Sequence, residues 1–246
     1  MNVAVFTLGL SPPIAVEFLL GLSNRGIKCD RGIAIITKGA APSFQALKIA
    51  LHWSSKATNL FPFLSKDVLV KDLSYVSLFS KKIVIDDIAR PRDCQTFRVQ
   101  FNSALRDAIK WAGEDVSKVY VCVAGGRKTI PIDATLISIA EGIRNVYHVI
   151  APKIPGIAGE FANLVAGKVA GKIDEVEVGD KILPRGALLE KLSKFAEKPW
   201  ETEKDLIKYS LTLCFPPRNL EFYLVKIPIP RLSLEERKRF REEVLS

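Results

Sequence analysis

Two short segments hold the residue types best suited to chemistry on a phosphate. Near the N-terminus, Gly9, Leu10 and Ser11 follow an apolar run and precede two prolines. In the middle of the chain, the segment Gly125–Thr129 reads GGRKT and also follows an apolar run. Glycines let backbone N–H groups approach an anion, and lysine, arginine and hydroxyl groups bind phosphate oxygens. These residue types predict two turns that handle a phosphate-bearing ligand.

Other kinds of chemistry find little support in the sequence. The chain has two histidines, and we interpret both as structural, because His52 stands in an expected helix and His148 in an expected strand. No cluster of His, Cys, Asp and Glu has the spacing of a zinc site. The P-loop pattern GxxxxGK[ST] and the dinucleotide pattern GxGxxG are both missing. We therefore expect no metal and no cofactor, and a reaction carried by serine, lysine and arginine.

The same residues also have a purely structural interpretation. Ser11 could cap the helix that follows it, since serine is a favoured N-cap residue. Arg90 and Arg92, in a later loop, could be solvated surface charges. Capping and catalysis compete for the one hydroxyl group of Ser11, so the position of that group in the structure distinguishes them.

The elements that must position these residues alternate between strands and helices. Short, continuously apolar runs are typical of strands buried on both faces of a parallel sheet, and apolar residues at helical spacing predict the helices between them. Strands are expected at 2–8, 31–37, 68–70, 82–86, 119–126 and 146–151, and helices at 12–25, 42–56, 94–113 and 129–143. Residues 1–154 are therefore predicted to form an α/β, Rossmann-like three-layer domain with a mainly parallel sheet.

The carboxyl ends of these strands should form the ligand site, because ligands of open parallel sheets bind there. The turns expected at that edge are 9–12, 37–40, 86–92 and 125–129. Their hydroxyl and basic side chains are those of Ser11, Thr37, Lys38, Arg90, Arg92, Arg127, Lys128 and Thr129. We expect these side chains to converge on an anionic ligand.

Residues 155–246 are predicted to form a smaller α+β accessory region. Helical patterns at 155–171, 185–196 and 206–215 surround the alternating segment KIDEVEVG, which is typical of a hairpin arm. The segment 221–227 favours a strand that could return to the main sheet. Ser233 and Glu236 have the spacing of a capping box and predict a last helix.

Charge and cysteine content suggest the partner and the compartment. The 246 residues carry a formal net charge of +9 and a pI near 9.4, which favours an anionic partner, although a surface rich in Lys and Glu also suits a thermophilic protein. The four cysteines lie far apart beside apolar segments, as in reduced cytoplasmic proteins. No apolar run approaches the roughly 20 residues of a membrane-spanning helix, and no basic segment precedes the first apolar run as in a signal peptide.

The two turns and their flanking segments resemble a known family. The stretch TLGLSPPIAVEFLLGL, the strand ending in IIT and the segment VAGGRKT with the apolar helix after it are similar in order and spacing to CRISPR-associated Rossmann-fold (CARF) domains. Among these domains, the chain most resembles the ring nucleases. The resemblance covers about residues 1–150, and the C-terminal part is much less diagnostic.

This resemblance implies both a ligand and a reaction. Ring nucleases bind cyclic oligoadenylates, usually cyclic tetra-adenylate, across a homodimer, so that each motif is used twice around a ligand of matching symmetry. Their reaction needs no metal: a ribose 2′-hydroxyl attacks its own 3′-phosphate and leaves a 2′,3′-cyclic phosphate, which ends the signal of a type III CRISPR system. A membrane partner and stable binding of a DNA or RNA polymer are not expected.

The resemblance also implies roles for individual residues. Ser11 corresponds to a turn hydroxyl that touches the scissile ribose or phosphate, and Lys128 to a lysine that stabilises the transition state or protonates the leaving oxygen. Arg90 and Arg92 match a loop arginine of some relatives only loosely, and Arg127 could instead hold the turn. The ligand-binding residues expected beside these two are Gly9, Leu10, Thr37, Lys38, Arg90, Arg92, Gly125, Gly126, Arg127 and Thr129.

Two alternatives stay open. Many binding-only sensors share this fold and these turns, so the chain could be a non-catalytic cyclic-oligoadenylate sensor or a transcriptional regulator with a C-terminal effector region. The segment Lys181–Ile229 is compatible with a winged-helix DNA-binding unit but lacks a dense basic recognition helix. An ordinary nucleotide-dependent enzyme is disfavoured by the missing phosphate-loop and dinucleotide motifs.

Overall fold

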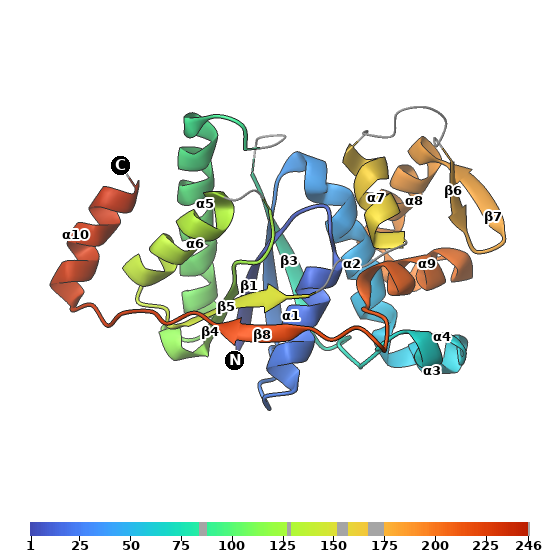
Figure 1. The fold of residues 1–246 in the computed structure, drawn as a ribbon, viewed down its shortest axis with the longest axis horizontal. Coiled ribbons are helices and arrows are strands. Elements are labelled where there is room, and N and C mark those ends of the chain that lie inside the picture. The colour runs from blue at the N-terminus through green and yellow to red at the C-terminus, as the bar shows by residue number, and fades with distance from the viewer. Residues whose placement is uncertain (84–87, 127–128, 152–156, 167–174, 246) are drawn as a thin grey trace.

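Six strands form the central sheet of the protein. The computed structural model describes residues 1–83, 88–126, 129–151, 157–166 and 175–245. The strand order is β3-β2-β1-β4-β5-β8 (Figure 1). The strands are β1 (Val3–Leu8), β2 (Arg31–Ile36), β3 (Ser77–Lys82), β4 (Val119–Cys122), β5 (Asn145–Ile150) and β8 (Tyr223–Lys226). Because β1 to β5 run parallel and only β8 is antiparallel to its neighbour β5, the predicted mainly parallel α/β architecture is confirmed.

Helices cover both faces of the sheet, which gives the Rossmann-like three-layer arrangement (Figure 1). Strand β1 is buried on both sides: Phe6 and Leu8 enter the core beneath α1 and α2, whereas Val3 and Val5 enter the core beneath α5 and α6. This two-sided burial explains why its sequence is continuously apolar. The helices of the first face are α1 (Pro13–Ser23) and α2 (Ala41–Trp53), and those of the second are α5 (Pro91–Trp111), α6 (Thr129–Ala140) and α10 (Leu234–Leu245).

The accessory region packs onto the first face. Helices α8 (Arg185–Glu197) and α9 (Lys204–Cys214) contact α2, and α7 (Ile157–Ala166) contacts α9. The expected hairpin is present as β6 (Glu175–Val178) and β7 (Lys181–Pro184). One hydrophobic cluster runs from β1 through α2 to α8 and α9, so the region shares the core of the sheet. The shorter helices are η1 (Lys38–Ala40), η2 (Ser54–Lys56), α3 (Ala57–Leu60), α4 (Leu64–Asp67), η3 (Val116–Lys118) and η4 (Pro199–Glu201).

Two of the expected strands differ from the structure, one in its position and one because its segment forms only an isolated bridge. The third strand occupies Ser77–Lys82, so the expected strand 82–86 overlaps it only at Lys82; residues 84–86 of that expected strand lie outside the described residues. It is an edge strand with largely exposed side chains, so the rule of continuous apolar residues does not apply to it. The segment 68–70 forms no strand and only an isolated bridge from Val68 to Pro217.

The C-terminal segment returns to the sheet as its sequence suggests. Strand β8 pairs with β5, with Val225 opposite His148, and completes the sheet edge. The expected capping box opens α10, because the Ser233 N–H donates to Glu236 Oε2 (2.7 Å) and the Glu236 N–H donates to Ser233 Oγ (3.2 Å). Both sequence-based expectations for this segment are therefore met.

Candidate functional site

The two turns singled out by the sequence meet at the carboxyl edge of the sheet. A Cβ atom placed on Gly9 would lie 3.3 Å from the backbone nitrogen of Gly126, so the two backbones are in contact. Just below, the Thr7 hydroxyl donates a buried 2.8 Å hydrogen bond to the Gly125 carbonyl oxygen. A Cβ on Gly125 would overlap the Thr7 carbonyl oxygen. The glycines are thus required by close packing of one turn on the other, and we call this contact the glycine junction.

Strand pairing explains why these distant segments come together. Strands β1 and β4 are parallel neighbours, with Phe6 opposite Cys122. Their carboxyl ends therefore lie at the same edge, and the turns that follow them are adjacent. Gly126 has φ of 97°, in the left-handed region that favours glycine.

The Ser11 hydroxyl does not cap α1. The helix begins at Pro13 with Pro12 in the N-cap position, and the Ala15 N–H donates to the Pro12 carbonyl oxygen (3.2 Å). Ser11 is half-buried, and its hydroxyl makes no hydrogen bond to any part of the chain that the structure describes. The structural interpretation of Ser11 as a helix cap is therefore wrong, and its hydroxyl is available beside the glycine junction.

The basic end of the GGRKT segment is only partly described. Lys128, expected to be catalytic, and Arg127, expected to bind the ligand or hold the turn, lie outside the described residues. Thr129 is the first residue of α6 and is exposed. The described residues on either side of Arg127 and Lys128 are Gly126, at the glycine junction, and Thr129, at the start of α6.

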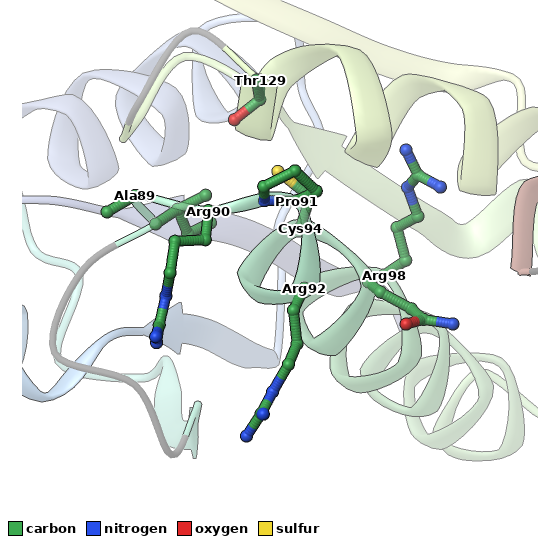
Figure 2. Close-up of a pocket in the computed structure, with 9 residues that line it drawn as sticks. Ala89, Arg90, Pro91, Arg92, Cys94, Arg98 and Thr129 are labelled. Atoms are coloured by element: carbon green, nitrogen blue, oxygen red, sulfur yellow. The ribbon is translucent and has the colours of Figure 1, made fainter.

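A pocket of about 690 Å³ opens between the first turns of α5 and α6 (Figure 2). Arg90, Arg92 and Thr129, all expected from the sequence, line it. The remaining lining residues are Ile88, Ala89, Pro91, Cys94, Gln95 and Arg98. Gly9, Leu10, Ser11, Gly125 and Gly126 belong to the junction and do not line this pocket. The glycine junction and the pocket are thus two separate features, and of the described GGRKT residues only Thr129 lines the pocket; the convergence of all the expected residues on one ligand stays a prediction.

The arginines of the pocket differ in their surroundings. In Figure 2, Arg90 and Arg92 point in the same direction, away from Thr129. Arg90 forms an ion pair with Asp93 (3.3 Å), and its side chain is 72% exposed. Asp93 also accepts the Arg90 N–H (2.9 Å), and the hydrogen bond from the Arg90 side chain is the main reason why the pKa of this carboxyl is lowered. Arg90 thus pairs with Asp93 in the first turn of α5 and also lines the pocket.

Arg98 is a pocket residue that the sequence analysis missed. Its Nε donates to Asp133 Oδ1 on α6 (2.9 Å), and its guanidinium also donates to the carbonyl oxygen of Val244 at the end of α10 (3.4 Å). Figure 2 shows its side chain directed toward α6. The sequence held a signal, because Pro91 and Arg98 are seven residues apart and share one face of α5.

The turn after β2 contributes a separate part of the rim. Thr37 precedes η1 and is half-buried, and Lys38 is exposed. Helix α7 contacts η1, so the accessory region borders the rim at this point. Neither residue belongs to the pocket lining as far as the structure describes it. Their convergence with the other expected residues stays a prediction.

A buried carboxyl close to the rim was also missed. Glu17, on α1, is 1% exposed, and its Oε1 has no hydrogen-bond partner among the described residues. Burial raises the pKa of Glu17 from 4.5 to about 7. Burial also raises the pKa of Cys122 to about 12, and the charge of Glu17 adds to that rise, which places the two groups near each other.

Comparisons with known proteins add no identification. No family model matches the chain, and no curated protein is similar to it. Within the described ranges, no group of three His, Cys, Asp or Glu side chains could hold a metal ion. Each helix of the described part is too short or too polar to cross a bilayer.

Proposed function

We propose that this protein is a CARF-type ring nuclease that binds cyclic tetra-adenylate across a homodimer. The observation that carries the proposal is the glycine junction, where Gly9 packs against Gly126. It joins the Ser11 turn to the turn that begins GGRKT, at the edge of the sheet where a Rossmann-like fold binds ligands. A net charge of +9 per chain suits a ligand with four phosphates.

The proposed reaction needs a positioned hydroxyl and cations. The ribose 2′-oxygen forms a bond to its own 3′-phosphorus, the bond to the 5′-oxygen breaks, and the 2′-hydroxyl proton passes to solvent. Ser11 holds the scissile ribose or phosphate, and Lys128 protonates the leaving 5′-oxygen. Alignment of the attacking and leaving oxygens, with charge stabilisation at phosphorus, supplies the rate enhancement. The Ser11 side chain is half-buried and its hydroxyl does not cap α1, which supports the proposed role of Ser11 in holding the ribose or phosphate.

The remaining rim residues are proposed to bind the ligand. Gly9, Leu10, Gly125 and Gly126 offer backbone N–H groups, and Arg90, Arg92 and Thr129 line the adjoining pocket. Residues 1–154 would then form the ligand-binding domain and residues 155–246 its accessory region. Cleavage gives a linear oligoadenylate with a 2′,3′-cyclic phosphate, and loss of the cyclic ligand ends the type III CRISPR signal.

The deciding experiment is an incubation of the protein with labelled cyclic tetra-adenylate in excess EDTA. We expect linear products that end in a cyclic phosphate, and a loss of turnover greater than about tenfold, or 1.4 kcal/mol, for Lys128→Ala. Lys118→Ala is the matched control, since Lys118 lies at the opposite end of β4 and pairs with Asp115 (3.2 Å). Tight binding without cleavage over hours would contradict the proposed nuclease activity and favour the alternative, a non-catalytic sensor.

A further inference from the structure

A second surface, on the other side of the sheet from the pocket, alternates aromatic rings with lysine side chains. It is built by the end of α2, by η2, α3 and α4, and by η4 and α9. Figure 1 shows α3 and α4 below α9, across the sheet from α5 and α6. We call it the aromatic–lysine surface, and its members are Trp53, Lys56, Phe61, Phe63, Trp200, Lys204 and Lys208.

Three lysines of this surface lie over aromatic rings. Lys56 Nζ is 5.2 Å from the centroid of the Trp53 ring. Lys204 and Lys208, one turn apart on α9, lie 5.8 Å and 4.8 Å from the ring centroids of Phe61 and Phe63, respectively. The centroids of these two phenylalanine rings are 6.3 Å apart. Cation–π contacts thus hold the ammonium groups in a row beside the rings.

The surface is continuous and partly apolar. Trp53 Nε1 donates to the Pro199 carbonyl oxygen (2.7 Å), which ties the end of α2 to η4 and places Trp200 beside it. Trp200 is 62% exposed and Phe63 is 50% exposed. Leu60, three residues before Phe63, also has an exposed side chain. Large rings are therefore presented to solvent next to positive charge.

Within the part of the chain that the structure describes, the lysines of this surface form no ion pairs with the carboxylates near them in sequence. Residues 52–66 contain two lysines and one histidine and no acidic residue. On the α9 side, the nearby carboxylates are engaged elsewhere: Glu201 with Lys198 (3.4 Å), Glu203 with Lys191 (2.7 Å) and Asp205 with Lys181 (3.5 Å). In the described ranges, Lys56, Lys204 and Lys208 form no ion pair. Asp67, the last residue of α4, is a further acidic residue that follows residues 52–66 in sequence.

We propose that the aromatic–lysine surface binds single-stranded nucleic acid. A single strand presents unpaired base faces and phosphates in alternation, and this surface presents two exposed rings, Phe63 and Trp200, beside lysine ammonium groups. Bases stack on exposed aromatic rings without regard to sequence, and lysines pair with the phosphates. A duplex hides its base faces, so it can use only the lysines.

Two other occupants fit the surface less well. The cores of protein interfaces are depleted in lysine, whereas lysine here accompanies three of the four rings. An anionic membrane would need the rings to project into the bilayer boundary, but Phe61 is buried and Trp53 is half-buried beneath their lysines. From the sequence, no stable binding of a nucleic-acid polymer is expected, and this proposal departs from that expectation; a stacking surface needs no basic recognition helix.

The test is a fluorescence anisotropy titration with labelled 15-nucleotide single strands of dT and of rU. A hairpin duplex of the same length is titrated in parallel. We expect the single strands to bind more tightly than the duplex, with a slope of log K against log salt of about −2 for three lysines. Phe63→Ala and Trp200→Ala should each weaken binding by about 5-fold to about 100-fold. Lys208→Gln should reduce the slope by about 0.7.

Matched control variants distinguish binding at the aromatic–lysine surface from non-specific attraction to a basic protein and from binding at the rim. Phe79→Ala removes another exposed ring that has a cation over it, Arg31 at 5.8 Å, at the β3 edge of the sheet. Phe79→Ala and Lys118→Gln should leave single-strand binding unchanged. The proposal is overturned if Phe63→Ala and Trp200→Ala bind as the unmodified protein does, if duplex binds as tightly as single strand, or if vesicles with anionic headgroups bind through these residues and single strands do not.

The result is independent of the proposed ring nuclease. Ser11→Ala and Lys128→Ala should leave single-strand binding intact, and Phe63→Ala should leave cleavage of cyclic tetra-adenylate intact. Phe63 and Trp200 are exposed, so both variants should fold, and circular dichroism before and after heating verifies this.

Discussion

The Thr7 hydroxyl donates its hydrogen bond to the carbonyl oxygen of Gly125, 118 residues later, and thereby fastens the end of β1 to the turn after β4. The bond is buried and 2.8 Å long. Because Gly9 and Gly126 touch directly above it, the spacing of the two turns is set by backbone contact rather than by flexible side chains. Any function of the rim depends on this fixed spacing.

Gly125→Ala should destabilise the protein by about 1–3 kcal/mol, the usual cost of overpacking a core. The added methyl group would overlap the Thr7 carbonyl oxygen, and backbone on both sides leaves little room to adjust. Denaturant unfolding measures the loss. Gly186→Ala on α8 is the control, since nothing lies within 4 Å of a Cβ there, and it should be neutral or stabilising by up to about 1 kcal/mol. Equal stability of the two variants would show that the junction is not tightly packed.

Ser11→Ala should change the free energy of unfolding by no more than about 0.5 kcal/mol, because the Ser11 hydroxyl caps no helix. The same change at Ser233 should cost about 1 kcal/mol, since the Ser233 hydroxyl accepts the Glu236 N–H at the start of α10. Paired unfolding measurements compare the two. A substantial loss of stability for Ser11→Ala would reveal a structural role, and a loss of activity alone would then no longer identify the residue as functional.

Glu17 should make the protein less stable as the pH rises. Burial raises its pKa in the folded state from 4.5 to about 7. The folded state therefore binds more protons than the unfolded state between these values, and stability falls across that window. The full effect is roughly 3 kcal/mol. Glu17→Gln, which is neutral at every pH, should match the unmodified protein near pH 4.5 and exceed its stability at pH 8. Parallel curves from pH 4.5 to 8 would contradict a raised pKa.

Glu141→Gln should loosen the C-terminal helix. Glu141 is 7% exposed; its Oε2 accepts one hydrogen bond from Arg241 on α10 (3.0 Å), and its Oε1 forms ion pairs with Arg241 (2.9 Å) and with Arg106 on α5 (3.7 Å). The cations left behind, Arg241 and Arg106, are 32% and 52% exposed, so solvent screens them and the loss should be about 1 kcal/mol. Faster amide hydrogen exchange over residues 234–245 reports it. Glu235→Gln removes an exposed pair with Arg239 (2.7 Å) and should change exchange little. If both variants exchange alike, α10 is held by its apolar contacts.

Much of the fold could be predicted from the sequence because strands that are buried on both faces contain almost only apolar residues. Strands β1, β2, β4 and β5 are buried on both faces and read as continuous apolar runs. Strand β3 was misplaced because it lies at the sheet edge, where SLFSKK follows no such pattern. The helix end near Gly113 was predicted correctly, since Gly113 has φ of 74° and its N–H bonds back to the Lys110 carbonyl oxygen (3.1 Å).

The site could be predicted only as far as strand order allowed. Parallel strands place their following turns at one edge, so the meeting of the Gly9 and Gly125 turns was foreseeable. The partnership of Arg98 with Asp133 was not, because it depends on how α5 packs on α6. The burial of Glu17 was equally hidden, since a lone acidic residue in an apolar helix does not reveal which side faces the sheet. Packing between elements decides both.

The antiparallel strand β8 has a consequence for synthesis of the chain. Its partner β5 ends at Ile150, and β8 begins at Tyr223, after α7, α8 and α9. While the ribosome adds the intervening residues, the outer edge of β5 stays unpaired in the nascent protein. Unpaired strand edges in such intermediates promote aggregation. The outer edge of β5 is therefore open to misassembly until β8 has been synthesised, and slower translation after β8 would give the sheet time to close.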